Sequence, residues 1–356
     1  MTIALLIVGS VTSAWGAELP RDLTDALPAD AEQLLDGLEG EFSDHDSLVK
    51  GFSLLRTRAK EAFRELLVSN IGNLVLLLGV VMLCALIDEL HRAAEQDRKD
   101  LVPMAGALAI TMLSVGSLRS LIGLGRETLE QMDLFGKMLL PTLSAAVAAS
   151  GGIVTAGVSQ VATVFFADTL LSLINSVLLP LTFCYIAAAM AEAILKEQNL
   201  KRIRTGIGKI VTWGLTGLMM AYVAFLKLVG AAGSAADSTA IRLTRSAISA
   251  AVPVVGGIIS DATETVTAGA ELLKNSIGVF GTLGVFSICL LPFVHLAVQF
   301  LLYKLTAFLA SAVGSEPLVN LIDAIGSVFG LVLGMVGAGA LVLLIAVITS
   351  VSVVVR

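Results

Sequence analysis

The chain has 356 residues, of which 56% are hydrophobic and only 15% charged, and its formal net charge is −6. Soluble domains average about 25% charged residues, so this composition excludes an ordinary water-soluble fold and is typical of a membrane protein. The negative charge argues against nucleic-acid binding, which needs a basic stripe. The three cysteines, Cys84, Cys184 and Cys289, lie in apolar runs, where free thiols are commonly buried. No Cys/His spacing matches a zinc site, so we expect no metal, cofactor or disulfide framework.

The N-terminus resembles an export signal. Ile3–Val11 is a short apolar core, and a run of small residues follows it. Such residues suit signal-peptidase cleavage, with Ala14 and Gly16, or Thr12 and Ala14, at the critical positions. No Lys or Arg precedes the core, so either the signal is weak or the true start lies upstream. We expect a signal peptide over residues 1–17.

Residues 18–68 form a polar region whose charge changes sign along its length. The stretch Glu18–Asp46 is strongly acidic, whereas Leu48–Leu67 is basic. Apolar positions of the basic stretch, among them Phe52 and Phe63, fall on one helical face. This pattern predicts an amphipathic helix that lies on the bilayer surface or against the bundle, with a basic face suited to anionic headgroups.

Apolar runs long enough to cross a bilayer follow this region. A helix of about 20 apolar residues crosses a hydrocarbon layer of about 30 Å, and Ala324–Val355 alone contains no charged residue. The runs lack the alternation of barrel strands, so they are expected to be helices, whose backbone amides are satisfied internally. We predict an all-α polytopic integral membrane protein with amphipathic outer-face helices and six transmembrane helices, at Ile71–Ile87, Leu101–Gly123, Gln160–Leu195, Ile210–Ala232, Ser276–Tyr303 and Ile325–Val351.

The segments between these runs define the remaining organisation. Gly125–Lys137 is predicted to be a polar connection. Met138–Val158, which contains Pro141 and a Gly pair, is either a seventh span or a re-entrant hairpin. Pro180 is expected to kink the third helix, and Gly233–Asn275 is an amphipathic stretch unlike a membrane crossing. After the signal, the chain is therefore divided into an outer region at 18–68, a first bundle half at 69–232, a Pro/Gly-broken outer segment at 233–275 and a C-terminal transmembrane pair at 276–356.

Basic residues predict the orientation in the membrane. Lys196–Lys209 is the most basic short loop, and such loops stay in the cytoplasm. With six spans, Asp88–Asp100 lies on the same side, whereas 18–67 and 233–275 lie on the outer face. This arrangement agrees with an exported N-terminus, although the basic helix before the first span runs against the charge rule.

Ionisable residues inside the spans are candidate functional groups, because a charge in hydrocarbon costs at least ~2.5–3.5 kcal/mol. Asp168 and His295 are the candidates for an intramembrane polar site. One interpretation is a polar pathway or a proton-linked site. The other is that Asp168 caps or bonds a neighbouring helix, while Lys227 and Glu192 reach an interface with their long side chains.

Small residues recur every fourth position along the last span, at Gly326, Gly330, Gly334 and Ala338. Small residues at this spacing let two backbones approach closely, which drives helix association where lipid offers no hydrophobic force. We predict that this stripe packs against another helix, in this chain or in a partner.

The segment Ala247–Asn275 reads AISAAVPVVGGIISDATETVTAGAELLKN. Its order of parts, Ala-Val-Pro, Val-Gly-Gly, Ser-Asp-Ala-x-Glu-Thr-Val and then Leu-Leu-Lys-Asn-Ser-x-Gly, resembles the stage III sporulation protein AE family. The layout of an export signal, a polar outer region and spans on both sides of this segment is also similar. The resemblance implies a non-enzymatic component of a multiprotein channel or secretion-like complex. That complex would lie in the mother-cell membrane around the forespore and support late forespore gene expression.

The resemblance also implies partners and positions. The partners are other stage III sporulation membrane proteins of the same complex, membrane lipids and a further copy of the chain, without nucleic acid. The family-typical positions, which would line a pore or contact a partner, are Pro253, Gly256, Gly257, Asp261 and Glu264.

An alternative function is a secondary transporter. Asp168 would supply a midplane polar site, and the stretches around Pro141 and Pro253 would act as broken helices. No clear internal repeat supports this interpretation. Since neither His-Glu-x-x-His, nor Gly-x-Ser-x-Gly, nor a phosphate-binding loop occurs in the sequence, we predict no enzymatic activity.

Overall fold

The computed structural model describes the backbone of residues 27–29, 31, 33, 45–93, 101–149, 153–195, 198–251 and 256–352. It describes the side chains of residues 27–29, 31, 33, 48–90, 101–149, 163–195, 199–228 and 273–351. Within these ranges the regular elements are all helices. The signal-peptide prediction and most of the acidic stretch lie outside the described residues.

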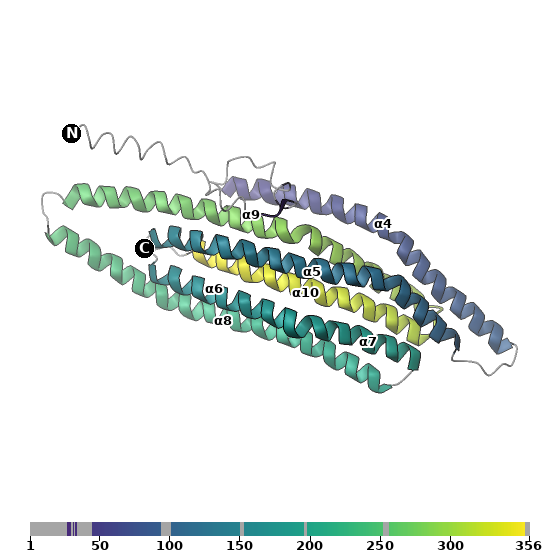
Figure 1. Cartoon of the computed structure of the whole chain (residues 1–356). Helices are drawn as coiled ribbons and strands as arrows, with labels where there is room; N and C mark the ends of the chain where they lie inside the picture. The colour runs from purple at the N-terminus through teal and green to yellow at the C-terminus, as the bar shows by residue number, and fades with distance from the viewer. Residues whose placement is uncertain are drawn as a thin grey trace.

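The helices form a bundle of long rods that alternate in direction (Figure 1). In chain order they are α4 (His45–Ala93), α5 (Leu101–Ala149), α6 (Ile153–Leu173), the π-helical turn η2 (Ile174–Leu178), α7 (Leu179–Leu195), α8 (Gln198–Ala251), α9 (Gly256–Ala310) and α10 (Glu316–Ser352). Because η2 joins α6 and α7 into one rod, six helical segments are long and apolar enough to cross a membrane. The predicted all-α, six-span membrane fold is confirmed.

The centre of the bundle is built by α9 and α10. The candidate span of α10 is 61% buried inside the protein and that of α9 is 50% buried, whereas those of α4 and α8 are only 17% buried. Phe329 on α10 and Leu283 on α9 are completely enclosed. The two most hydrophobic helices of the C-terminal half are therefore shielded by α4 to α8.

Two predicted interruptions in the first half do not occur as expected. Gly125–Lys137 is no connection but the middle of α5, which runs unbroken through Pro141 to Ala149. The reason is that this stretch has a continuous apolar face, and Gly125, Leu129 and Met132 on it are buried. Met138–Val158 is not a separate span, because its described residues belong to the end of α5 and the start of α6; the re-entrant hairpin stays a prediction.

The outer segment predicted at Gly233–Asn275 also takes a different form. It is mostly the continuation of α8, which has 54 residues, and of α9, which has 55. At 1.5 Å per residue each is about 80 Å long, far more than the ~30 Å of hydrocarbon. Figure 1 shows that α8 and α9 extend past the ends of α5 and α6 at this end of the bundle.

The basic amphipathic stretch Leu48–Leu67 continues into the first span without a break, within α4. Its Phe52 ring packs edge-on against Phe286 of α9, with 5.0 Å between the ring centroids. Further along, the Asn70 and Gln299 side chains are joined by a 2.8 Å hydrogen bond. Of the two predicted locations, the described structure shows this stretch against the bundle.

Pro180 lies two residues after the π-helical turn Ile174–Leu178. Proline has no N–H to donate, and its ring crowds the carbonyl four residues earlier in a regular α-helix. A π turn widens the helix at this point. The chain therefore accommodates Pro180 inside one continuous rod.

Candidate functional site

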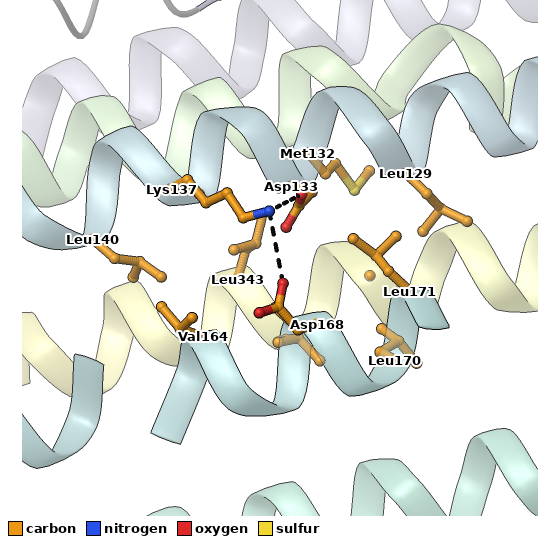
Figure 2. A pocket seen from close by; sticks show the side chains of 14 residues that line it. Leu129, Met132, Asp133, Lys137, Leu140, Val164, Asp168, Leu170, Leu171 and Leu343 are labelled. Atoms are coloured by element: carbon orange, nitrogen blue, oxygen red, sulfur yellow. Dashed lines mark hydrogen bonds and ion pairs between the residues drawn. The ribbon is translucent and has the colours of Figure 1, made fainter. Parts of the chain in front are cut away.

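An ion cluster joins α5 to α6 near the middle of the bundle (Figure 2). Lys137 Nζ lies 2.6 Å from Asp133 Oδ2, one turn earlier on α5, and 3.7 Å from Asp168 Oδ1 on α6. The side chains of Lys137 and Asp168 are 53% and 57% exposed, and that of Asp133 is 17% exposed. Asp168 is thus bonded to a neighbouring helix, and one cation is shared by two carboxylates.

The cluster borders a small apolar pocket between α5, α6 and α10. Leu129, Met132, Leu140, Leu171 and Leu343 form much of its wall, and Figure 2 shows these side chains around Lys137 and the two carboxylates. The pocket is open on one side, and its cavity volume is only about 30 Å³. The apolar wall with its charged rim is therefore a shallow depression that can accept no more than a small apolar group. The rim offers one cation and two carboxylates for polar contact.

A second ion pair joins α7 to α8. Arg204 Nε lies 2.8 Å from Glu192 Oε2, and both side chains are nearly enclosed, with 11% and 12% exposed. The guanidinium also donates to the Tyr185 hydroxyl at 3.3 Å. One of the two interpretations had Glu192 reach an interface with its long side chain; the structure pairs this carboxylate with Arg204 across the two helices.

A third cluster joins α9 to α10 at the same end of the bundle. Lys304 Nζ lies 2.6 Å from Asp323 Oδ1 and donates to Ser327 Oγ at 2.9 Å. Among the described residues, no group of three or more His, Cys, Asp or Glu side chains is placed to hold a metal ion. The three clusters therefore connect helices through direct ion pairs.

The structure does not bring the two predicted intramembrane groups together. His295 is half-buried on α9 and does not line the pocket beside Asp168. Sequence reasoning missed Lys137 as the partner of Asp168, and Asp133 as the second carboxylate on Lys137, because both were assigned to a connection. Their spacing of four residues was the available signal, since such pairs are neighbours on a helix.

The positions taken from the family resemblance lie at the start of α9. Gly256 and Gly257 begin this helix, and Asp261 and Glu264 follow within its first three turns. Pro253 lies outside the described residues, as do the side chains of Asp261 and Glu264. Their role in lining a pore or contacting a partner stays a prediction.

The small-residue stripe of α10 faces two helices within this chain. A methyl group added at Gly326 would lie 3.1 Å from Tyr303 Cβ of α9, and one at Gly330 would lie 3.0 Å from Phe300 Cδ2. Gly334 is exposed, and its nearest neighbour is Leu215 of α8 at 3.7 Å. Ala338 is buried. The stripe turns from α9 toward α8 because each four-residue step advances about 40° around an α-helix.

Other close approaches were missed by the sequence analysis. A methyl group at Gly284 of α9 would lie 2.5 Å from Phe135 Cζ of α5, and one at Gly281 would lie 2.7 Å from Leu139 Cδ2. Gly278 of α9 similarly meets Val351 of α10. The signal was a glycine every third residue, which keeps these positions on one side of the helix. Glycines thus bring α9 close to both α5 and α10.

Comparison with known proteins identifies a family. The model of the family described as stage III sporulation protein AE matches residues 44–354, which contain all six membrane-length helices. The chain is 24% identical over 288 residues to the stage III sporulation protein AE of Bacillus subtilis (strain 168), covering 80% of this chain and 71% of that protein. No solved structure matches the chain. The resemblance found in Ala247–Asn275 is confirmed.

Proposed function

The chain belongs to the stage III sporulation protein AE family, and we propose that it is a non-enzymatic subunit of a multiprotein channel or secretion-like complex. The family gives it a role in sporulation, and its six apolar helices make it a multi-pass membrane protein. The complex connects the mother cell with the forespore and supports late forespore gene expression. The subunit sits in the mother-cell membrane around the forespore, beside other stage III sporulation membrane proteins.

The observation that carries this proposal is the match of the family model to the whole bundle. The length of α8 and α9 supports it. The apolar run of α8 ends at Ala232, whereas the helix continues to Ala251. These 19 further residues extend roughly 28 Å. A projection of that size offers a contact surface outside the hydrocarbon layer, which a subunit of a transenvelope complex needs.

One of the two broken helices that the transporter alternative requires is unbroken in the structure. It required a helix interrupted near Pro141, but α5 runs through this residue. Asp168, its midplane group, is engaged with Lys137. Nothing in the described structure favours this alternative over the channel-complex subunit.

The proposal is tested at Asp261 and Glu264, which lie three residues apart and so share one face of α9. We expect that Asp261→Lys with Glu264→Lys abolishes partner co-purification or spore formation, while the protein still accumulates in membranes. The matched control is Asp261→Asn with Glu264→Gln. It should be far less damaging, because a structural contact tolerates lost charge better than an acid–base catalyst does.

Three measurements separate the outcomes: abundance in membranes, co-purification of partners and spore count. If the Asn/Gln variant fails to form spores with normal abundance and normal partner binding, the non-enzymatic role is wrong. If the Lys variant binds partners and sporulates normally, this face of α9 is no contact surface of the complex.

A further inference from the structure

The outward side of α5 carries a charged face in the middle of the helix. We define this charged face as Arg119, Arg126, Glu127, Glu130 and Lys137 on α5, all exposed, together with Asp168 of α6. It extends over 19 residues of α5, from Arg119 to Lys137, or roughly 27 Å along the helix. The ion pair Arg126–Glu130, at 2.9 Å, is open on both sides, with side chains 60% and 53% exposed.

Contacts on the opposite side of α5 fix the level of this face along the bundle. Gly125 meets Val332 of α10, and Gly136 meets Leu343, where an added methyl would lie 2.7 Å from Leu343 Cδ2. Arg126 to Lys137 therefore lie level with Val332 to Leu343. That part of α10 belongs to the run Ala324–Val355, which has no charged residue.

Other helices are apolar at this same level. Tyr222 of α8 donates to the Val342 carbonyl at 3.0 Å, which places it beside the same part of α10. Next to it, Met220 is 69% exposed, and Leu341 of α10 is 51% exposed. Such side chains are suited to lipid. One side of the bundle is thus apolar where α5 is charged.

The first helix repeats this arrangement. Phe52 contacts Phe286, and Asn70 bonds Gln299, so the residues between them lie level with the apolar run Ser276–Tyr303 of α9. Between those two contacts, the charged side chains of α4 point outward, and the exposed ones are Arg56, Arg58, Lys60, Glu61, Arg64 and Glu65. At this level of the bundle, α4 and α5 therefore expose charged side chains, whereas α8 and α10 expose apolar side chains suited to lipid.

Lipid is a poor neighbour for this surface, since each charge at hydrocarbon depth costs at least ~2.5–3.5 kcal/mol. A dry protein contact is also unfavourable, because it would strip water from several ions that are already paired along α5. Water hydrates the cations and the carboxylates alike, without the desolvation cost of a dry contact. We propose that the charged face of α5, with Asp168, lines a water-filled path at the depth of the hydrocarbon layer.

The charged face would form one wall of a water-filled channel, so this inference rests on the proposed function. Neighbouring subunits would close its far side and keep lipid out. The wall is amphoteric: Arg119 and Arg126 lie toward one end, the carboxylates of Glu127, Glu130 and Asp168 follow, and Lys137 lies among them. A wall of mixed sign passes small polar solutes of either charge more readily than a single-sign ring does.

Thiol labelling tests the proposal in membranes from sporulating cells, where partners are present. Cys84, Cys184 and Cys289 are first replaced by serine. Gly123→Cys and Leu134→Cys then probe the charged face: Gly123 has open space around it, and Leu134 is 62% exposed. The matched controls, Leu341→Cys and Met220→Cys, lie level with the charged face on the apolar side. A sulfonated, water-soluble maleimide is added to opened membranes, and unreacted thiols are counted by gel shift.

We expect both probes to react at least about tenfold faster than both controls, because maleimide adds to the thiolate, which forms only in contact with water. If all four positions react alike, this level of the bundle lies outside the hydrocarbon layer and the proposal is wrong. If none reacts, the face is covered by lipid or by a dry contact, and the proposal is equally wrong. Neither labelling result affects the partner and spore measurements at Asp261 and Glu264, so the water-filled path and the proposed function can be refuted independently.

Discussion

Arg204 and Glu192 show how a charge is kept inside this bundle. Their side chains are only 11% and 12% exposed, and the 2.8 Å contact joins α8 to α7. Breaking an enclosed pair leaves one ion without a partner, which costs about 3–5 kcal/mol. The open pair Arg126–Glu130 is different, since exposed pairs contribute only about 0–1 kcal/mol.

We therefore predict that Glu192→Gln and Arg204→Gln each lower the unfolding free energy by about 3–5 kcal/mol. The double variant should lose clearly less than the sum of the two, because the second change removes the charge that the first left unpaired. Arg126→Gln is the matched control and should cost less than about 1 kcal/mol. Denaturant unfolding in detergent micelles measures all four variants. Additive losses for Glu192→Gln and Arg204→Gln would show that the two groups are not coupled.

The sequence did not predict which charged side chains form ion pairs with one another. Asp168 stood out because an ionisable residue in an apolar run is costly, but nothing local pointed to Lys137, which lies on another helix. Glu192 and Arg204 are 12 residues apart, on either side of a helix connection. Such pairs depend on how two helices are rotated against each other. That rotation is set by packing, not by the residues near the charge.

At the scale of helices, α5 contacts α10 through glycines that differ sharply in their surroundings. Gly125 is buried and meets Val332, a branched side chain only 1% exposed. Gly123, one half-turn earlier, has no neighbour within 4 Å. Because both lie in the middle of the same helix, a change from Gly to Ala gains about the same helix propensity at each position, roughly 1 kcal/mol.

We predict that Gly125→Ala destabilises the protein and Gly123→Ala does not. At Gly125 the new methyl overpacks the contact with Val332, which costs about 1–3 kcal/mol. At Gly123 only the gain in helix propensity remains, so the melting temperature should be equal or higher. Thermal unfolding in detergent compares the two variants with the parent chain. Equal behaviour of the two variants would mean that α5 and α10 do not meet at Gly125.

Long apolar runs made the helices predictable, but their lengths were not. The middle of α5 was predicted to be a connection because Gly125–Lys137 holds five charged residues. Its apolar positions Leu129, Met132 and Leu139 keep the helical period and are buried. A helix with a charged outer face is easily mistaken for a loop when composition alone is considered. The same holds for the far ends of α8 and α9, which were recognised as amphipathic but not as parts of two helices longer than the membrane.

On the scale of the whole molecule, exposed apolar side chains gather at two different levels. One set is carried by the end of α4 and the start of α5, where Leu83 and Met112 are 60% and 78% exposed. Near it, Gly106 of α5 meets Leu318 in the first turn of α10. The other set lies farther along the bundle, where Met220 and Leu341 face outward. Leu318 and Leu341, which mark the two levels, lie 23 residues apart on α10, or roughly 35 Å along the helix, so a flat hydrocarbon layer of about 30 Å does not cover both levels fully.

The alternating rods also fix which connections share a side of the membrane. At one end of the bundle α4 ends and α5 begins, α7 ends and α8 begins, and α9 ends and α10 begins (Figure 1). Lys201 of α8 and Glu316 of α10 are 3.7 Å apart there. At the other end α5 ends and α6 begins, and α8 ends and α9 begins. The basic residues Lys201, Arg202, Arg204 and Lys209 lie at the first end, in the opening turns of α8 and not in the predicted loop, so this end is expected to face the cytoplasm.

We predict the labelling pattern of three single cysteines placed at exposed positions in the serine-substituted background. Asn199 is the second residue of α8, Ser311 follows α9, and Ala149 ends α5. In intact growing cells that express the chain, an impermeant maleimide should label Ala149→Cys but neither Asn199→Cys nor Ser311→Cys. All three should react once the membrane is opened. The reverse pattern would leave the bundle intact but invert its orientation. Labelling of only one of Asn199→Cys and Ser311→Cys in intact cells would contradict the alternation of helices itself, because the structure places both at the same end.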